Sequence, residues 1–183
     1  MKKKDTHNFS SKLLQWYDLH GRKDLPWQQS INAYRVWVSE IMLQQTQVNT
    51  VTPYYLRFMH RFANVDALAA ASTDEVMHHW SGLGYYSRAR NLHATALRIR
   101  DEFSSQFPND IDLLQSLPGI GRSTAGAICA IAFNSPCAIL DGNVKRVLAR
   151  HNNIDGWPGK SSVAKQLWQI AEQHTPTQRN RDY

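Results

Sequence analysis

Cysteine is scarce in this sequence, and its scarcity excludes several kinds of protein. The 183 residues include two cysteines, Cys129 and Cys137, which are too few for a disulfide framework or for a metal site with four thiolate ligands. We expect both to be small, buried, apolar residues. The eight histidines are scattered, and the adjacent pair His78 and His79 falls in a helical pattern where neighbours face different directions. We therefore predict no metal site.

Long hydrophobic runs and strand patterns are also missing. No apolar run approaches the roughly 20 residues that a membrane-spanning helix needs, and the first residues lack the apolar stretch of a secretory signal. These absences predict a cytoplasmic protein with no membrane partner. No segment alternates apolar and polar residues in the manner of a β-strand, so we expect an all-α fold.

Acidic residues are fewer than basic ones. Lys and Arg total 21 against 15 Asp and Glu, which gives a formal net charge of +6. A positive surplus favours polyanionic partners over acidic ones. Surplus lysine is often only a solvated surface, so charge alone does not select a nucleic acid.

Apolar residues at helical spacing are abundant. Hydrophobic residues make up 42% of the chain, enough for an ordinary core. Ser72 and Glu75 have the spacing of an N-terminal capping box, and Trp80 lies at the end of that short helix. Further helices are predicted at residues 9–20, 34–41, 48–62, 85–102, 111–117, 123–133, 144–148 and 163–170.

The most specific stretch is LPGIGRSTAGAI, residues 117–128. A short apolar helix precedes a turn that contains Gly119 and Gly121, and a new helix follows. The unpaired N–H groups and the positive dipole end of a helix start can hold a phosphate without reading a base. A plain interhelical turn is the simpler interpretation of Gly-x-Gly alone. The flanking residues 117–118 and 122–124 favour a helix-hairpin-helix DNA-binding motif.

Two acidic residues lie beside apolar patterns. Glu40 borders the apolar stripe of its helix, and Asp141 follows the apolar run 136–140. A solvent-facing Glu is the commoner fate of such a residue, and an Asp before a helix is ordinarily an N-cap. Two carboxylates beside a phosphate-holding turn in a basic chain together favour a catalytic pair.

Four segments together resemble one known family. WVSEIMLQQTQV, WSGLGYYSRARNLH, LPGIGRSTAGAI and ILDGNVKRVLAR are similar to the MutY family of adenine DNA glycosylases. That family lies in the helix-hairpin-helix glycosylase superfamily, whose members remove damaged or mispaired bases from DNA. The resemblance runs from about Leu13 to Thr175. It implies an all-α fold of two helical lobes with DNA bound across the cleft between them.

The resemblance also implies a reaction and assigns roles to residues. The reaction is hydrolysis of the N-glycosidic bond of adenine mispaired with 8-oxoguanine or guanine in double-stranded DNA, by a monomeric, nucleoid-associated enzyme. Glu40 is then the general acid, and Asp141 is the anion that stabilises the charged sugar. The implied DNA-binding residues are Gln45, Tyr85, Gly119, Gly121, Arg122, Ser123 and Thr124. The implied adenine-pocket residues are Trp27, Gln28, Leu43 and Asn143.

Ser123 bears on the type of reaction. The endonuclease III branch of the superfamily carries a lysine at this place, which forms a Schiff base and cuts the strand. Serine here implies a monofunctional enzyme that releases the base only. Two alternatives stay open on the sequence: a non-catalytic DNA-binding fragment, and an endonuclease III-like glycosylase/lyase.

The family implies more chain than these residues hold. Its members carry a [4Fe-4S] cluster on four cysteines and a C-terminal domain that reads 8-oxoguanine. This sequence has neither the cluster ligands nor that domain and stops in a polar stretch, so we expect the N-terminal portion of a longer protein with an incomplete second lobe. We predict three segments: residues 1–29, a helix and loop of the cluster-side lobe; 30–136, a helical domain with the hairpin at about 113–134; and 137–183, the start of the cluster-side lobe.

Overall fold

The expected all-α architecture is confirmed. A computed structural model describes the backbone of residues 6–183 and the side chains from Phe9 onward, and these residues form helices and no strand. The first five residues of the predicted N-terminal segment lie outside the described range. The elements are α1 (Thr6–His20), η1 (Pro26–Gln28), α2 (Ala33–Leu43), α3 (Val48–Arg61), α4 (Val65–Ala69), α5 (Thr73–Trp80), α6 (Ser87–Glu102), α7 (Ile111–Gln115), α8 (Arg122–Ala127), η2 (Ile128–Ala132), α9 (Gly142–Asn152) and α10 (Ser161–His174).

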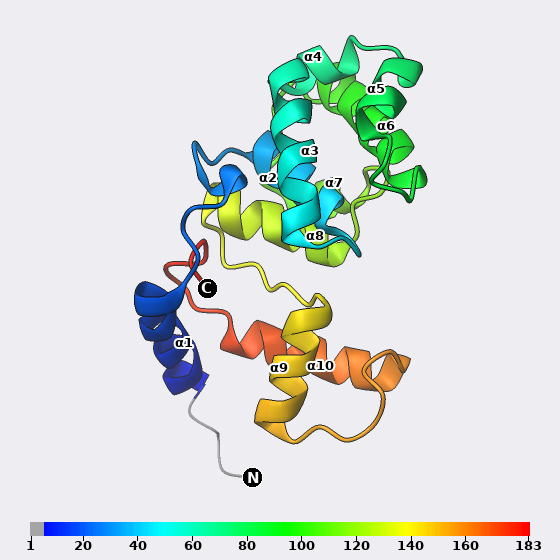
Figure 1. Cartoon of the computed structure of the whole chain (residues 1–183). Coiled ribbons are helices and arrows are strands. Elements are labelled where there is room, and N and C mark those ends of the chain that lie inside the picture. The colour runs from blue at the N-terminus through cyan, green and yellow to red at the C-terminus, as the bar shows by residue number, and fades with distance from the viewer. Residues whose placement is uncertain (1–5) are drawn as a thin grey trace.

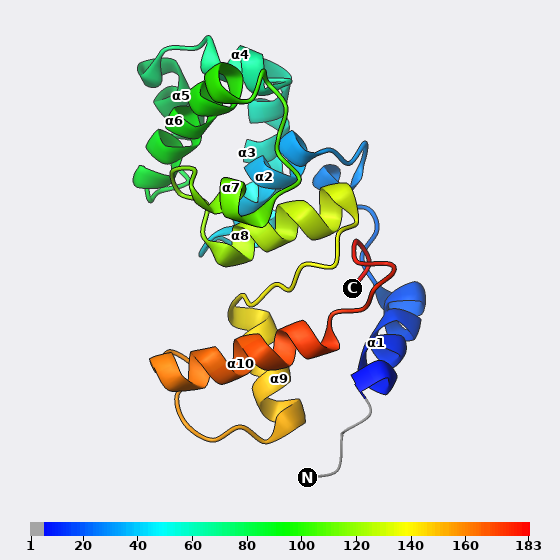
Figure 2. The ribbon, with the colours of Figure 1, turned by 180° about the vertical axis from the view of Figure 1, so that it is seen from behind.

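The helices form two lobes. Figures 1 and 2 show α2 to α8 at one end of the molecule and α1, α9 and α10 at the other, joined by an extended crossing after η2. The larger hydrophobic core runs from Trp27 to Cys129. The smaller core is made by Leu140, Leu148, Leu167 and Ala171, with Phe9 packed against it. Two lobes therefore follow from two separate cores, while the exact bounds of the three predicted segments stay a prediction.

Capping residues set where several helices begin. Asn32 accepts a hydrogen bond from the backbone N–H of Arg35 at 2.9 Å and so caps α2. Ser72 accepts one from the N–H of Glu75 at 3.1 Å, which confirms the predicted cap of α5. Each such bond satisfies one of the donors that a helix start leaves unpaired.

Three local predictions differ from the structure. The basic helix begins at Ser87 rather than at Tyr85, because Tyr85 has a left-handed backbone with φ of 50°. The short helix α4 was not predicted, since its five residues are too few to show a period. The predicted helix 123–133 changes after Ala127 into the π-helical turn η2.

The first helix packs through only a portion of its length. The ring of Phe9 lies between those of His151 and His174, at 4.5 and 4.6 Å between centroids. Further along α1, Trp16 and Leu19 are 56% and 80% exposed. The helix thus packs against the smaller core through Phe9, while its C-terminal half is held on one side by the ion pair between Asp18 and Arg179 and leaves Trp16 and Leu19 exposed.

None of the helices from Thr6 to His174 combines the length and the apolar character that crossing a bilayer would require.

Candidate functional site

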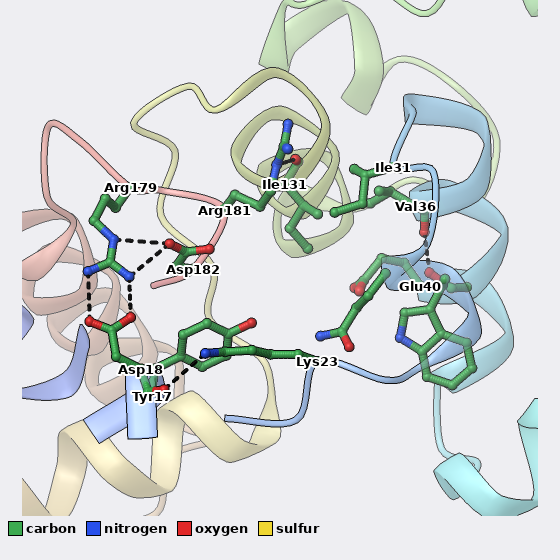
Figure 3. Close-up of a pocket in the computed structure, with 13 residues that line it drawn as sticks. Tyr17, Asp18, Lys23, Ile31, Val36, Glu40, Ile131, Arg179, Arg181 and Asp182 are labelled. Carbon is green, nitrogen blue, oxygen red and sulfur yellow. Dashed lines mark hydrogen bonds and ion pairs between the residues drawn. The ribbon is translucent and has the colours of Figure 1, made fainter. Parts of the chain in front are cut away.

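A pocket of about 400 Å³ lies between the two lobes, beside α2. Its walls come from the end of α1 and the following loop, from α2, from η2 and from the segment after α10 (Figure 3). The lining residues are Tyr17, Asp18, Lys23, Trp27, Gln28, Ile31, Val36, Ser39, Glu40, Ile131, Arg179, Arg181 and Asp182. The pocket thus brings together three residues that the sequence selected: Trp27, Gln28 and Glu40.

Glu40 is the acidic group on the α2 wall of this pocket. Val36, Trp37 and Ile41 bury the core face of α2, and Glu40 projects from the edge of that face into the pocket. Burial raises the pKa of the Glu40 carboxyl from 4.5 to about 7, and the negative charge of Asp141 acts in the same direction. A carboxyl with such a pKa holds a proton near neutrality and can give it to a substrate.

Asp141 is held by the start of α9. Its Oδ1 accepts hydrogen bonds from the backbone N–H groups of Asn143 at 2.9 Å and Val144 at 2.7 Å. The amide of Asn143 donates to Oδ2 at 3.4 Å. Asp141 is exposed and does not line the pocket, although its charge reaches Glu40. The N-cap function is therefore observed, and it also fixes the orientation of this carboxylate.

Trp27 and Gln28, both within η1, line the pocket. The Trp27 ring meets the Tyr55 ring edge-on at 5.5 Å between centroids, which anchors the loop to the larger core. The Gln28 amide donates to the carbonyl of Arg22 at 2.9 Å and accepts from the N–H of Leu25 at 3.2 Å. Gln28 therefore shapes the loop that carries Trp27.

The hairpin follows α7 and leads into α8. Gly119 has a φ of +75°, and a Cβ there would come within 2.8 Å of the Cβ of Asn91. Gly121 has an ordinary backbone and open space around it. Glycine is thus required by the turn at 119, whereas at 121 it leaves the surface of the helix start open.

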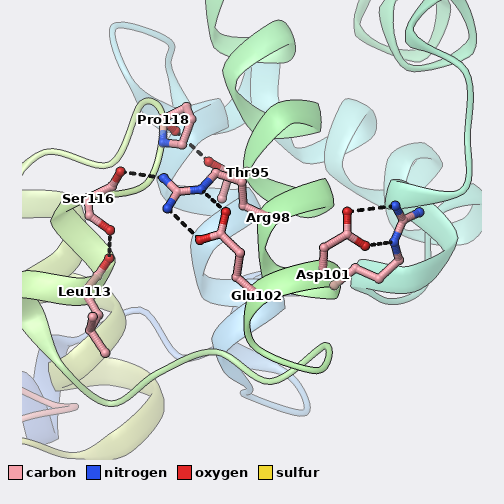
Figure 4. A network of polar contacts seen from close by, with 8 residues as sticks. Thr95, Arg98, Asp101, Glu102, Leu113, Ser116 and Pro118 are labelled. Atoms are coloured by element: carbon pink, nitrogen blue, oxygen red, sulfur yellow. Dashed lines mark hydrogen bonds and ion pairs between the residues drawn. The ribbon is translucent and has the colours of Figure 1, made fainter.

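Helix α6 holds this hairpin in place. Thr95 donates its hydroxyl hydrogen to the carbonyl of Pro118 at 2.8 Å, and Arg98 donates to the carbonyl of Ser116 at 2.8 Å (Figure 4). Glu102 in turn pairs with Arg98 at 2.6 Å. The backbone of the turn is therefore fixed from its rear, and no side chain caps the first turn of α8.

These features agree with similarity to known proteins. The family model for HhH-GPD, described as "HhH-GPD superfamily base excision DNA repair protein", matches residues 38–173 of this chain. The chain belongs to the HhH-GPD superfamily. It is 49% identical over 168 residues to a protein named adenine DNA glycosylase from Buchnera aphidicola subsp. Baizongia pistaciae, covering 92% of this chain and 47% of that protein. For proteins of the same name from Rattus norvegicus and Homo sapiens the identities are 45% and 44%, covering 98% and 96% of this chain but 36% and 34% of theirs.

Solved structures agree on the fold of this HhH-GPD protein. A structure titled as a thermostable thymine-DNA glycosylase superimposes with a TM-score of 0.83 at 24% identity, over 97% of this chain and 81% of that one. A non-covalent endonuclease III–DNA complex gives a TM-score of 0.77 at 18% identity, over 100% and 84%. The helix-hairpin-helix glycosylase fold is thereby confirmed, and the chain spans about half the length, or less, of the curated relatives it matches.

Residues 122 to 124 of the hairpin make contacts that the HhH-GPD pattern alone does not reveal. The Arg122 guanidinium lies over the Trp168 ring and pairs with Glu172, both on α10. The Ser123 hydroxyl accepts a hydrogen bond from the N–H of Leu140 at 3.1 Å, next to Asp141. Thr124 is 8% exposed and lies within the fold. The side chains of Arg122 and Ser123 therefore join the two lobes.

Four further predicted site residues do not line this pocket. Gln45 and Tyr85 are exposed on the turns after α2 and before α6. Leu43 packs against the larger core, and Asn143 is exposed at the start of α9. The structure therefore does not place Leu43 or Asn143 in the wall of this pocket.

Sequence reasoning missed the segment after α10. Arg179 donates to both carboxylate oxygens of Asp18, at 3.1 and 2.5 Å, and Arg181 donates to the carbonyl of Ile131 at 2.7 Å. Asn180 is 4% exposed. This segment forms the pocket wall opposite Glu40 (Figure 3), and its charged residues Arg179, Arg181 and Asp182 were the one signal that the sequence offered.

The residues present do not fit an iron–sulfur cluster. A [4Fe-4S] cluster needs four cysteine thiolates, and this chain has two. Burial, followed by the neighbouring Cys137, raises the pKa of the Cys129 thiol to about 12, which keeps it protonated. Cys137 is only half-buried, contrary to expectation. Within residues 6–183 no group of three or more His, Cys, Asp or Glu side chains is arranged to hold a metal ion.

Proposed function

We propose that this chain is the base-releasing portion of a monofunctional adenine DNA glycosylase. The substrate is adenine mispaired with 8-oxoguanine or guanine in double-stranded DNA, bound by a monomer in the cytoplasm and nucleoid. The observation that carries the proposal is Glu40, a carboxyl with a pKa raised to about 7 in the wall of a pocket beside a second carboxylate, Asp141. The similarity to proteins named adenine DNA glycosylase supports the choice of base.

The pocket suits a single extruded nucleotide. Its volume of about 400 Å³ and its aromatic wall at Trp27 fit a planar base. The wall also carries Arg181 and Lys23, whose positive charge attracts the phosphate backbone that enters with the nucleotide, whereas the charge of Arg179 is paired with Asp18 and Asp182. The hairpin holds a neighbouring phosphate through backbone N–H groups at the start of α8, where no side chain competes.

The chemistry begins with a proton on Glu40. Transfer of this proton to N7 of adenine makes the base a better leaving group, and the bond between C1′ and N9 then breaks. The sugar acquires the positive charge of an oxocarbenium ion, which the Asp141 carboxylate stabilises. Water adds its hydroxyl to C1′ and its remaining proton returns to the carboxylate pair. Ser123 supplies no amine, so the strand is left uncut.

Replacement of Glu40 tests the proposal. The 183-residue chain is mixed with a duplex that contains adenine opposite 8-oxoguanine, and base release is measured by alkaline cleavage of the abasic product. Glu40→Gln abolishes release and retains duplex binding, because only the transferable proton is lost. Glu75→Gln, at a residue that pairs with Arg61 and contacts neither the pocket nor the hairpin, is the matched control and retains release. Equal release by wild type and Glu40→Gln would refute the assignment, and binding without release in the wild type would favour a DNA-binding module.

A further inference from the structure

Arg88 is a buried charged residue that lies between two surface turns, the one after α2 and the one before α6. It lies in the first turn of α6 and is 8% exposed. Burial of a guanidinium requires acceptors for its N–H groups, and Arg88 finds them for Nη1 and Nη2, while its buried Nε has no hydrogen-bond partner. The position of its acceptors therefore shows which segments of the chain Arg88 holds together.

One set of acceptors lies at the C-terminal end of α2. Nη1 of Arg88 donates to the carbonyls of Ile41 and Met42 at 2.9 Å each, and to that of Gln44 at 2.6 Å. A helix end leaves such carbonyls without intrahelical partners and carries a partial negative charge. Arg88 thus fixes the backbone immediately before Gln45.

The other set lies in the turn that precedes α6. Nη2 of Arg88 donates to the carbonyls of Leu83 and Gly84 at 3.3 Å each. The guanidinium carbon also lies 5.2 Å from the centroid of the Tyr85 ring and 5.4 Å from that of Trp80. Arg88 therefore contacts the Tyr85 side chain directly and fixes the backbone immediately before it.

Both of the residues that follow these carbonyls have a left-handed backbone. Gln45 has a φ of 56° and Tyr85 a φ of 50°. Residues other than glycine adopt this conformation at a cost, and they keep it only where surrounding contacts enforce it. The hydrogen bonds of Arg88 are such contacts for both residues, and Tyr85 remains 59% exposed.

The two turns share a face with the hairpin. A second pocket of about 200 Å³ is lined by Arg88, Gln44 and Gly119. Arg88 therefore lies behind a surface that carries Gln45 and Tyr85 close to the proposed phosphate-binding turn. An exposed aromatic ring and an exposed amide beside a phosphate contact can enter the space between stacked bases.

We propose that Arg88 is a positioning residue that holds Gln45 and Tyr85 as a single wedge, so that opening of the duplex depends on a side chain that touches no DNA. The inference rests on the proposed function, since a wedge has a use only where a base is extruded. It assigns to Arg88 a role in base extrusion and none in proton transfer.

The first test compares Arg88→Lys with Arg100→Lys. Lysine keeps the charge but cannot reach two sets of carbonyls at once. Arg100, on the same helix, donates to the carbonyl of Ala69 and is distant from both turns. Hydrogen exchange of the free protein should be faster by about tenfold in residues 44–47 and 82–86 of Arg88→Lys, because the bonds lost are to a charged group. Unchanged exchange in either segment would overturn the proposal.

The second test measures duplex opening without chemistry. In a Glu40→Gln background, 2-aminopurine placed next to the mispaired adenine reports unstacking by its fluorescence. Arg88→Lys should reduce the rate of the fluorescence rise by about tenfold while duplex affinity changes less than about threefold. Arg100→Lys should leave both the rate and the affinity as they are in the Glu40→Gln protein. An unchanged rate would overturn the proposal.

A third test applies if Arg88→Lys does not fold. With Arg88 intact, Gln45→Ala and Tyr85→Ala should reduce opening non-additively, because a single wedge loses its function when either member is removed. Additive losses would refute a single wedge. If the background protein shows no fluorescence rise, the proposed function itself fails, while the exchange measurement, which needs no DNA, still decides whether Arg88 couples the two turns.

Discussion

The guanidinium of Arg122 lies 3.9 Å from the centroid of the Trp168 ring, across the boundary between the two lobes. Arg122 begins α8 and Trp168 lies within α10, so this contact and the adjacent pair with Glu172 connect the hairpin to the second lobe. The resemblance implies that Arg122 is a DNA-binding residue. Its contacts with Trp168 and Glu172 also stabilise the arrangement of the two lobes.

We expect Arg122→Ala and Trp168→Leu to be coupled. Each should lower the free energy of unfolding by about 0.5–1 kcal/mol, and the double variant should lose less than the sum, because both remove one cation–π contact. Denaturant unfolding of the four proteins measures this coupling. Additive losses, together with a reduced salt slope of DNA binding for Arg122→Ala alone, would instead identify Arg122 as a phosphate ligand.

Glu40 should make stability depend on pH. Its pKa is raised from 4.5 to about 7 in the folded state, so between these values the folded chain keeps a proton that the unfolded chain has released. The free energy of unfolding therefore falls as pH rises through this window. Glu40→Gln removes the cost of ionising a buried carboxyl. The variant should therefore be more stable than wild type at pH 8 by about 1–3 kcal/mol, with no such gain below pH 4.5.

Thermal unfolding at pH 4 and pH 8 measures this effect. Glu102→Gln provides the contrast, because the hydrogen bond from Arg98 lowers the pKa of Glu102 and its replacement should give no gain at pH 8. A Glu40→Gln protein no more stable than wild type at pH 8 would show that Glu40 is not held protonated.

Two variants of Asp141 should distinguish its proposed catalytic role from its role as the N-cap of α9. Asn caps a helix about as well as Asp, so Asp141→Asn should leave the melting temperature nearly unchanged while base release is lost with the negative charge. Asp141→Ala should in addition lower stability by about 1 kcal/mol, since the N–H groups of Asn143 and Val144 lose their acceptor. Normal release by Asp141→Asn would leave the residue with only its capping role.

The two hairpin glycines should respond differently. Gly119→Ala should lose about 1–2 kcal/mol of stability, because φ is +75° and the new Cβ would press on Asn91. Gly121→Asp should fold normally and bind every duplex more weakly, since it adds a negative charge in the open space at the helix start. Fluorescence anisotropy against salt concentration checks this, and sequence-dependent loss at Gly121 would contradict phosphate binding.

Ser123 should prevent strand cleavage. Its hydroxyl is engaged with the N–H of Leu140 and offers no amine for a Schiff base. Borohydride added during turnover should trap no major covalent adduct, and an abasic product should survive until alkali is added. Efficient trapping by the wild type that disappears in Lys145→Ala would instead indicate a lyase.

Much of the fold could be predicted because its determinants are local. The stripe of Tyr34, Trp37 and Ile41 and the cap at Ser72 specify helices through residues three or four positions apart. The deviations arise where distant segments meet. Burial of Arg88 depends on carbonyls more than 40 residues away, and the left-handed backbone of Tyr85 depends on that contact.

The candidate site was predicted incompletely for the same reason. Glu40 was selected from its place beside an apolar stripe and Trp27 from the family resemblance, and the structure places both at the pocket. The opposite wall was not predicted, because a polar segment gives no periodic signal and Arg179 finds its partner Asp18 161 positions earlier. Only the folded chain shows that this segment and α1 meet.

The placement of Phe9 also determines the order in which the protein can assemble. The larger core uses residues that are continuous in sequence from Trp27 to Cys129, so its contacts can form as soon as that stretch has left the ribosome. Phe9 belongs to the other core, and its ring partner His174 lies at the end of α10, after the whole of the larger core has been made. Helix α1 must therefore wait for α10, and this closure between segments that are distant in the sequence is the step we expect to be slow.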